Sequence, residues 1–291
     1  MRRTSQPRSK SECPDDIQYR KRPTIRQFRQ IVLKHYRDHG RSLAWRRTTD
    51  PYRILVSEIM LQQTQVERVS VKYPSFIAAF PDFPSLAKAP LSDVLAVWQG
   101  MGYNRRAISL QQCARRVVED YNGVLPQDPE ILATFPGIGR ATAASICAFA
   151  FNMPVVFIET NIRRAFIHFF FDDSVTVDDA EILPLATRAL YRKDPRIWYN
   201  ALMDLGTDLK RTVKNPNRRS RHYTKQAAFE GSDRKIRGSI LRTLLAEKRM
   251  TLLAIKKRFS EDPARIIRIL GDLEDEGFIV RSGTYFAIVT R

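Results

Sequence analysis

Residues 135–143 read Phe-Pro-Gly-Ile-Gly-Arg-Ala-Thr-Ala, and they join two apolar helical runs, one over 129–135 and the other over 140–151. Glycine can adopt positive φ and lets a second backbone approach closely, so the two glycines suit a tight turn. Amide groups at the N-terminus of the second helix would point outward, where partial positive charge and unsatisfied donors favour a phosphate. The stretch therefore predicts a phosphate-binding turn, with contacts expected from Gly137, Ile138, Gly139, Arg140 and Thr142. A plain corner between helices, with glycines for close packing, is the alternative.

The composition of the chain favours a polyanionic partner. It has 291 residues, of which 43% are hydrophobic, and a formal net charge of +18. The chain can therefore bury a core, and its charge suits a polyanionic partner, of which double-stranded DNA is the one we expect, although a membrane surface would also attract such a chain. It contains no apolar run of about 18 residues or more and no visible signal peptide. We expect no membrane segment, and an intracellular monomer that works on DNA.

The three cysteines, Cys13, Cys113 and Cys147, lie far apart in the sequence. Their spacing matches neither a metal site nor a disulfide framework, so reduced thiols are the simplest interpretation. We expect no cofactor and no metal ligated by side chains, although the turn at 135–143 leaves room for a structural ion.

Helical spacing of apolar residues covers most of the chain before residue 210. Proline and glycine mark nearly every junction, and no alternation typical of strands precedes residue 275. We predict an all-α body over 25–209, preceded by a basic mobile tail over 1–24. The expected helices cover 24–40, two segments within 52–80, 85–88, 91–98, 104–121, 129–135, 140–151, 161–170, 178–190 and 196–210.

Residues 210–231 are predicted to form a basic linker. The segment 210–225 combines seven lysines and arginines with no acidic residue. Such density favours a segment that follows phosphates, with Arg218, Arg219 and Arg221 as the expected contacts. A solvated loop is the alternative.

Residues 232–291 are predicted to form a separate small α/β domain. Three helical patterns, over 234–247, 252–259 and 263–276, precede a hairpin pattern over 278–289 with a Ser-Gly turn. This order resembles a winged helix-turn-helix module, whose third helix enters the major groove in its DNA-reading form. Arg265 and Arg268 would then be the DNA contacts. The acidic second half of that helix argues against this use, and a protein-contact module is the alternative.

Four further motifs accompany the stretch at 135–143. They are Pro-Tyr-Arg-Ile-Leu-Val-Ser-Glu-Ile-Met-Leu-Gln-Gln-Thr-Gln at 51–65, Trp-Gln-Gly-Met-Gly-Tyr at 98–103, Ile-Glu-Thr-Asn-Ile-Arg-Arg at 158–164 and Leu-Met-Asp-Leu-Gly at 202–206. Together they resemble the endonuclease III superfamily of DNA glycosylases and, within it, the MutY-type adenine glycosylase branch. The resemblance covers roughly residues 25–210. It implies a two-lobed helical domain in which the turn at 135–143 belongs to a helix-hairpin-helix element.

Two glutamates carry the expected chemistry. Glu58 sits in an apolar helical stretch, so it is either paired there or holds a proton near neutral pH; a buried glutamate that braces the backbone is the alternative. Glu159 precedes a helix and follows an apolar run, so it can cap that helix or face a cleft. Base excision needs a proton for the departing base and a carboxylate that stabilises the positive sugar. The resemblance assigns the first role to Glu58 and the second to Glu159.

The same resemblance implies supporting residues around these glutamates. The target base must leave the helical stack to be excised, and Gln63, with its neighbour Gln62, matches the position that wedges into the gap. The expected base pocket and its support are Trp45, Arg46, Tyr103 and Asn161.

Three departures from the family pattern bear on function. Glu159 stands where the family has aspartate, and misplacement of a carboxylate by about an ångström can cost on the order of a hundredfold in rate. Ala141 stands where the bifunctional branch has its Schiff-base lysine, so we expect little or no lyase activity. No cysteine follows Gly206, so the ligands of an iron–sulfur cluster are missing.

We expect a monofunctional DNA glycosylase of base excision repair that removes a base, with mispaired adenine as the leading substrate. A glycosylase for another modified or mismatched base, such as thymine or uracil, is one alternative. A non-catalytic DNA-binding protein on the same fold is the other.

Overall fold

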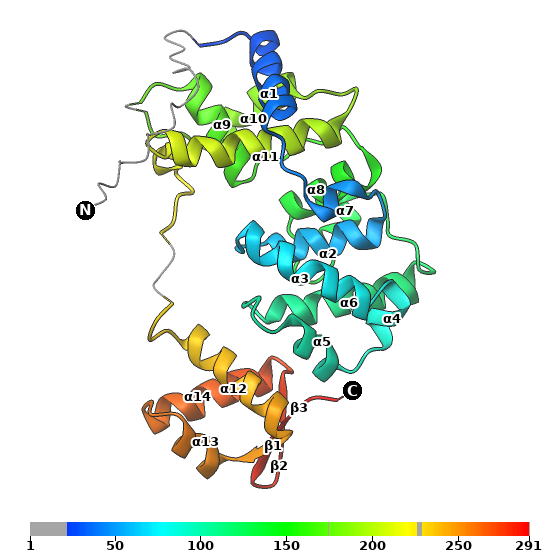
Figure 1. Ribbon diagram of the computed structural model, residues 1–291, viewed down its shortest axis with the longest axis vertical. Helices are drawn as coiled ribbons and strands as arrows, with labels where there is room; N and C mark the ends of the chain where they lie inside the picture. The colour runs from blue at the N-terminus through cyan, green and yellow to red at the C-terminus, as the bar shows by residue number, and fades with distance from the viewer. Residues whose placement is uncertain (1–21, 174, 226–228, 291) are drawn as a thin grey trace, which may run out of the picture.

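The computed structural model describes residues 22–173, 175–225 and 229–290 as a helical body with a small sheet near the C-terminus (Figure 1). The helices of the body are α1 (Ile25–His39), α2 (Pro51–Leu61), α3 (Val66–Ala79), α4 (Phe83–Lys88), α5 (Leu91–Trp98), α6 (Arg105–Asp120), α7 (Pro129–Leu132), α8 (Arg140–Phe151), α9 (Thr160–Phe170), α10 (Asp179–Ala189) and α11 (Pro195–Thr212). The mainly helical fold predicted from the sequence is thus confirmed. Most of the predicted tail, residues 1–21, lies outside the described residues.

The helical body has two lobes, each with its own hydrophobic cluster. The first lobe is built from α2–α7, and its core includes Phe76, Trp98 and Leu110. The second lobe combines α1 with α9–α11, although α1 is far from these helices in the sequence, and its core includes Phe28 and Trp198. Helix α8 contributes small residues to both clusters and so lies between the lobes. Among the described residues, none of the helices is long and apolar enough to cross a membrane.

Local signals explain where these helices start. The side chain of Asp50 accepts a hydrogen bond from the backbone N–H of Tyr52 and caps α2, while Pro51 occupies the first helical position. Asp128 caps α7 in the same way, but that helix ends at Leu132 and not at the predicted Phe135. The remaining residues up to Gly139 form the turn that leads into α8.

The predicted linker is in part a structured element of the second lobe. Helix α11 extends to Thr212, and the short 3₁₀ helix η2 (Pro216–Arg219) packs on α9. The buried side chain of Asn217 donates to the carbonyl of Thr160, and the backbones of Val177 and Ser220 form a bridge. Burial of Pro216 and Asn217 fixes this segment, which the density of positive charge alone did not reveal.

A C-terminal unit, which we define as residues 232–290, follows. It contains α12 (Asp233–Glu247), β1 (Arg249–Thr251), α13 (Leu252–Arg258), α14 (Pro263–Asp275), β2 (Ile279–Ser282) and β3 (Tyr285–Ile288). The strands form an antiparallel sheet in the order β1-β3-β2, in which Ala287 pairs with both Arg249 and Val280. Strand β1 was not predicted, because three residues are too few to show alternation.

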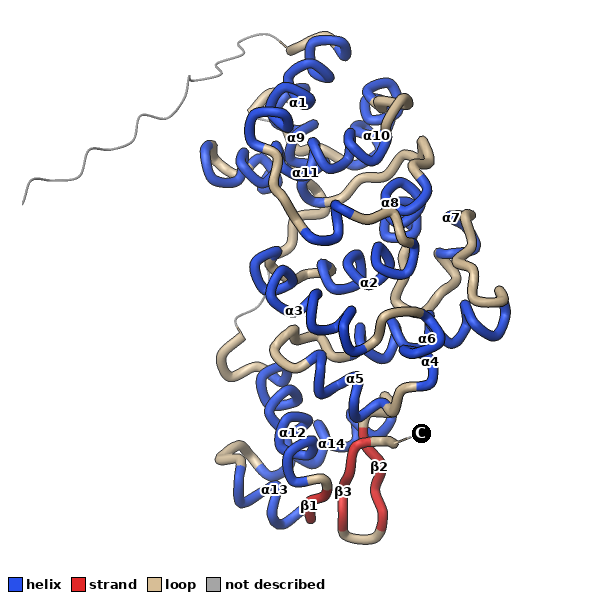
Figure 2. The backbone as a smooth tube through the Cα atoms, turned by 45° about the vertical axis from the view of Figure 1, so that its right-hand side comes forward, coloured by secondary structure: helices blue, strands red, loops and turns tan. Residues whose placement is uncertain are grey.

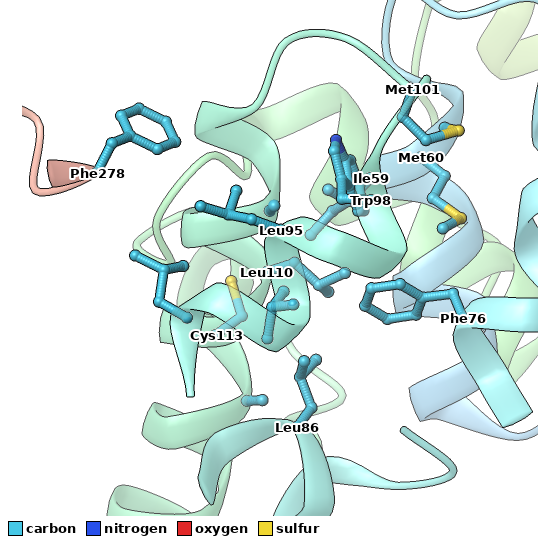
Figure 3. Packing of buried hydrophobic residues seen from close by; sticks show 14 of the residues in the cluster. Ile59, Met60, Phe76, Leu86, Leu95, Trp98, Met101, Leu110, Cys113 and Phe278 are labelled. Atoms are coloured by element: carbon cyan, nitrogen blue, oxygen red, sulfur yellow. The ribbon is translucent and has the colours of Figure 1, made fainter. Parts of the chain in front are cut away.

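The C-terminal unit sits at one end of the molecule and the second lobe at the other, with the first lobe between them (Figures 1 and 2). Helix α12 packs against α5 of the first lobe. Phe278 is fully buried and belongs to the same cluster as Leu95 and Trp98 (Figure 3). The unit is therefore joined to the first lobe through apolar contacts.

Candidate active site and DNA-binding surface

A cavity of about 250 Å³ lies between the two lobes. It brings together Glu58 from α2 and Glu159, which precedes α9, although about a hundred residues separate them in the sequence. Four more of its lining residues are Trp45, Arg46, Ala141 and Asn161. The structure thus gathers both predicted catalytic residues and three of the four predicted pocket residues around one space.

Glu58 is held by a hydroxyl group from the facing helix. The hydroxyl of Ser145 on α8 donates to Oε2 of Glu58 over 2.6 Å. Burial raises the pKa of Glu58 to about 7, the negative charge of Glu159 adds to this effect, and the Ser145 hydrogen bond opposes it. Near neutral pH this carboxyl group can therefore hold a proton and give it away.

Glu159 caps a helix and lines the cavity at the same time. Its Oε1 accepts hydrogen bonds from the backbone N–H groups of Asn161, at 2.7 Å, and Ile162, at 2.9 Å. Its second oxygen lies 3.4 Å from the side-chain amide of Asn161. Burial raises the pKa of Glu159, and the two backbone hydrogen bonds oppose that rise. Both roles considered for this residue from the sequence are thus combined in one side chain.

Arg46 reaches the cavity while paired to a buried carboxylate. Its guanidinium group forms two hydrogen bonds of 2.8 Å with the two oxygens of Asp204, which also accepts from Arg41. Burial alone would raise the pKa of Asp204, but the hydrogen bonds and charge of Arg46 lower it. The neighbouring Trp45 is buried edge-on against Tyr73. These contacts anchor the first lobe to α11.

The side chain of Asn161 is fixed by a second buried arginine. Arg164 donates to Oδ1 of Asn161 over 2.7 Å and to the carbonyl oxygen of Gly206. A Cβ atom at Gly206 would lie only 2.2 Å from the carbonyl oxygen of Asn161. Glycine is therefore required in the motif at 202–206, because it lets α11 approach the start of α9.

The turn before α8 presents its helix N-terminus without a side-chain cap. Gly137 has φ of +73°, and a Cβ there would lie 2.8 Å from Cβ of Ser109, so this position requires glycine. Gly139 has an ordinary φ of −85°. Gly139 and Arg140 are exposed and Thr142 is partly exposed. The backbone N–H of Ile138, which was also predicted to contact a phosphate, donates to the carbonyl of Phe135 within the turn.

Of the two predicted wedge residues, one lines the cavity and the other lies next to it in the same turn. Gln62 donates from its side chain to the carbonyl of Gly137 over 3.0 Å and lines the cavity. Gln63 is exposed and has φ of +52° in the turn between α2 and α3. Tyr103 differs from the expectation, because it lines a separate groove in which Arg234 of the C-terminal unit donates to its hydroxyl group.

The predicted phosphate contacts beyond the hairpin fall into two classes. Arg218 is exposed, and Arg221 is exposed beside Asp178, 3.6 Å away. Arg219 instead turns inward and donates to the carbonyl oxygens of Ile167, Phe171 and Asp172. Arg219 is thus a structural residue at the C-terminal end of α9, contrary to the prediction.

The predicted contacts on α14 are also engaged within the protein. Arg265 and Arg268 both form ion pairs of 2.7 Å with Asp233 at the start of α12. Arg265 further pairs with Glu261, and Arg268 with Asp272. These carboxylates offset the positive charge that the sequence pattern alone assigned to a DNA-facing surface.

Sequence reasoning missed Ser145, Asp204 and Arg164. Each is a polar residue within a mostly apolar helical segment and is buried in the structure. A buried polar side chain needs a hydrogen-bond partner, so a polar residue among apolar helical neighbours was a usable sign of a buried polar contact. The identity of each partner depended on contacts between helices far apart in the sequence.

Comparisons with known proteins agree with this arrangement. The HhH-GPD superfamily base excision DNA repair protein family matches residues 56–184. The adenine DNA glycosylase of Mycobacterium tuberculosis (strain CDC 1551 / Oshkosh) is 33% identical over 281 residues, which cover 86% of this chain and 90% of the relative. The adenine DNA glycosylase of Homo sapiens is 34% identical over 203 residues, which cover 66% of this chain and 36% of the relative.

Solved structures give the same result for the fold. A thermostable thymine-DNA glycosylase superposes with a TM-score of 0.61 at 26% identity and covers 67% of this chain and 91% of that chain. Endonuclease III in a trapped covalent complex with DNA superposes with a TM-score of 0.53 at 20% identity, over 62% of this chain and 83% of that chain. The resemblance inferred from the motifs is confirmed, and this chain belongs to the HhH-GPD superfamily of base excision DNA repair proteins, in the family of the adenine DNA glycosylases.

Proposed function

We propose that this protein is a monofunctional DNA glycosylase, which takes mispaired adenine out of duplex DNA and hydrolyses its N-glycosidic bond. The single observation that carries the proposal is the cavity that Glu58 and Glu159 both line. The family relationship to adenine DNA glycosylases supports the choice of base.

The two carboxyl groups take different roles because their surroundings differ. Glu159 accepts two backbone hydrogen bonds at a helix N-terminus, and both favour its charged form. Glu58 accepts one hydroxyl hydrogen bond and has a pKa of about 7. We therefore assign the proton to Glu58 and the negative charge to Glu159 at neutral pH.

The reaction follows from this assignment. Glu58 donates its proton to a ring nitrogen of the departing base, so the electrons of the glycosidic bond leave with a neutral base. Glu159 stabilises the positive charge on the sugar and orients the water that adds to it. The water that adds to the sugar loses one proton to solvent, and Glu58, now ionised, regains one proton from solvent.

The exposed start of α8 supports a grip on the DNA strand that supplies the base. Its first-turn amide groups have no side-chain cap, and they suit a phosphate next to the extruded nucleotide. Gln62 lines the cavity and its neighbour Gln63 lines the adjoining groove, and from there they would fill the gap left in the duplex.

The lining of the cavity also bears on what the enzyme does not do. Ala141 forms part of the wall where a lysine would be needed for a Schiff base, and among the described lining residues there is no lysine. We propose hydrolysis without appreciable strand cleavage. The sequence has three cysteines in all, fewer than a four-cysteine iron–sulfur cluster needs, so the proposed mechanism uses side chains alone.

For the C-terminal unit we propose a winged helix. Three helices combined with a three-stranded antiparallel sheet, in which β2 and β3 form the terminal hairpin, support this assignment. The module would add to the DNA-binding surface of the enzyme.

The test is direct identification of the released base. Duplexes with adenine opposite guanine or 8-oxoguanine are incubated with the full chain, and free bases are identified by mass spectrometry. We expect free adenine and alkali-labile sites from the parent protein, and neither from Glu58→Gln. Glu67→Gln, the same change at an exposed position on α3, is the matched control and should retain activity.

Thymine opposite guanine is a second candidate substrate, favoured by the similarity to the thermostable thymine-DNA glycosylase. Duplexes with mismatched thymine or uracil belong in the same panel for this reason. Release of thymine without adenine would replace the first candidate by the second. Tight binding without release of any base would refute an enzymatic role and leave a non-catalytic DNA-binding protein.

A further inference from the structure

A second and larger hollow adjoins the active-site cavity. This groove, of about 1150 Å³, lies between the C-terminal unit and two loops of the first lobe, residues 62–65 and 99–104. Gln62 and Thr64 line both the groove and the cavity of Glu58. The turn between α2 and α3 therefore forms a ridge with the cavity on one side and the groove on the other.

The groove is strongly basic. Seven of its lining side chains are lysine or arginine, and one, Glu276, is acidic. Glu276 is shared by Arg105 and Arg237, so it offsets only part of this charge. Arg68 on α3 and Arg242 on α12 are exposed on the two walls, and no ion pair is formed by either within the described part of the chain.

The ridge and the groove wall are held by a stack of buried or half-buried groups. Arg106 is buried and donates to carbonyl oxygens of Met60, Gln62 and Gly102, which ties the end of α2 to the loop before α6. The ring of Tyr103 lies 5.5 Å from the guanidinium carbon of Arg106 and 5.4 Å from that of Arg234 on α12. The C-terminal unit is thus connected to the ridge through Tyr103 and Arg106.

One glycine on the groove wall also points to a ligand. Gly238 lies in the middle of α12, where glycine is less favourable than alanine by roughly 0.5–1 kcal/mol. A Cβ atom there would meet no protein atom within 4 Å, so packing does not explain the glycine. A missing side chain at this position leaves space for the close approach of another backbone.

We propose that this groove holds the sugar-phosphate backbone of the DNA strand that faces the excised base, and that α12 is the helix of the C-terminal unit that contacts DNA. The inference rests on the proposed function, because it takes the cavity of Glu58 as the site of the extruded nucleotide. When that nucleotide enters the cavity and Gln63 fills the gap, the complementary strand lies across the ridge. The basic groove is on that side.

The choice of α12 over α14 follows from charge. Arg265 and Arg268 on α14 share Asp233 and have further acidic partners. Arg242 has no such partner within the described residues, and it faces the groove together with Arg234 and Gly238. Along α12 these positions are four residues apart, so they lie on one face of the helix.

The first test measures how binding depends on salt. The full chain carrying Glu58→Gln, so that the substrate persists, is titrated onto a mispaired duplex between low and moderate salt. With Arg68→Ala and Arg242→Ala added, the slope of log K against log [salt] should fall by about 1.8, or about 0.9 for each lost phosphate contact. Adding Arg265→Ala and Arg268→Ala instead is the matched control and should leave the slope unchanged. The proposal is overturned if the slope is unchanged by the substitutions of Arg68 and Arg242, or if it falls only with the substitutions of Arg265 and Arg268.

The second test identifies the strand. Single phosphates are replaced by uncharged methylphosphonates, first in the strand opposite the target base and then in the target strand. Neutral phosphates in the opposite strand should weaken binding of the Glu58→Gln protein but have little further effect once Arg68 and Arg242 are alanine. The assignment would be refuted if the two alanine substitutions removed the effect of neutral phosphates in the target strand and not in the opposite strand. Failure of the parent enzyme to release any base would refute the proposed function. The binding measurements above do not require base release, so the two proposals can fail separately.

Discussion

The hydroxyl oxygen of Ser145 lies 2.6 Å from Oε2 of Glu58 and 2.9 Å from the carbonyl oxygen of Thr142. A hydroxyl has one hydrogen to donate and can also accept. When Glu58 is ionised, the Ser145 hydroxyl can donate to its carboxylate. When Glu58 is neutral, the hydroxyl can accept a hydrogen bond from the protonated carboxyl group and donate its own hydrogen to the carbonyl of Thr142. Ser145 therefore keeps Glu58 in place through both halves of a proton transfer.

Ser145→Ala is expected to move the pH profile of base excision to higher pH. Loss of the hydrogen bond removes an interaction that lowers the pKa of Glu58, so this pKa rises above about 7. A hydrogen bond to a charged group is worth roughly 1.5–3 kcal/mol, which corresponds to a shift of roughly one to two pH units. Because the acid works in its protonated form, the rate should then decline at a correspondingly higher pH. Single-turnover rates between pH 5 and pH 9 give the profile.

The matched control is Ser57→Ala. Ser57 also lines the cavity, but its hydroxyl donates to the carbonyl of Ile54 within its own helix. For this variant, the decline of the excision rate at alkaline pH should occur at the same pH as in the parent. An equal displacement by both substitutions would mean that the Ser145 hydroxyl has no specific effect on Glu58.

Glu58→Gln is expected to stabilise the fold at alkaline pH while it abolishes excision. Burial raises the pKa of Glu58 from its ordinary value of 4.5 to about 7, so the folded state binds the proton more tightly than the unfolded state. The parent therefore loses stability as pH rises from about 4.5 through about 7, where Glu58 ionises. The amide of the Gln variant stays neutral, so the variant does not lose this stability. At pH 8 the free energy of unfolding should exceed that of the parent by up to about 3 kcal/mol, and at pH 4.5 the two should nearly agree.

Urea denaturation at the two pH values measures this difference, with Glu67→Gln as the exposed control. A gain of equal size at both pH values would show that packing of the amide, and not relief of a buried charge, is responsible. No gain at pH 8 would show that Glu58 is ionised at little cost, contrary to its placement in the cavity.

Much of the fold and the centre of the candidate site could be predicted from the sequence. Apolar spacing and the residues at helix starts located most helices within a few residues, and motif matches brought Glu58 and Glu159 together. The sequence did not reveal the direction in which single side chains point. Arg218 and Arg219 look equivalent in a basic segment, yet the first is exposed and the second binds three carbonyl groups inside the second lobe.

Contacts between distant segments account for the other differences. Tyr103 is drawn to the groove by Arg234, which lies 131 residues further along the chain. The two arginines of α14 are neutralised by Asp233, more than 30 residues before them. Periodicity reports which face of a helix is buried, but it does not report which residue of another helix meets that face.

Two substitutions of Glu159 should separate its chemical role from its role as a helix cap. Glu159→Gln keeps an oxygen that can accept from the backbone N–H groups of Asn161 and Ile162, but it removes the charge. Burial raises the pKa of Glu159, so the neutral amide should be at least as stable as the parent at neutral pH, while the single-turnover rate falls on the order of a hundredfold or more. Glu159→Ala should lose a similar amount of activity and also about 1 kcal/mol of stability with the cap.

Thermal unfolding and excision assays on both variants decide the matter. If Glu159→Gln retained the parent rate, the carboxylate would be a cap alone, and the positive sugar would need another stabilising group. If Glu159→Ala unfolded at the same temperature as Glu159→Gln, the two backbone hydrogen bonds would contribute nothing measurable.

Arg218 and Arg219 should respond in opposite ways to replacement by alanine. Arg219→Ala leaves carbonyl oxygens at the end of α9 without their donor, so it should cost roughly 1–3 kcal/mol of stability and leave the salt dependence of DNA binding unchanged. Arg218→Ala should leave stability unchanged and reduce the slope of log K against log [salt] by about 0.9. Each variant serves as the control for the other, because both remove one arginine, and therefore one positive charge, from the same segment. A reduced slope with Arg219→Ala and intact stability would place its side chain on the DNA surface, and the inward hydrogen bonds would then have to be exchanged for phosphate contacts when DNA binds.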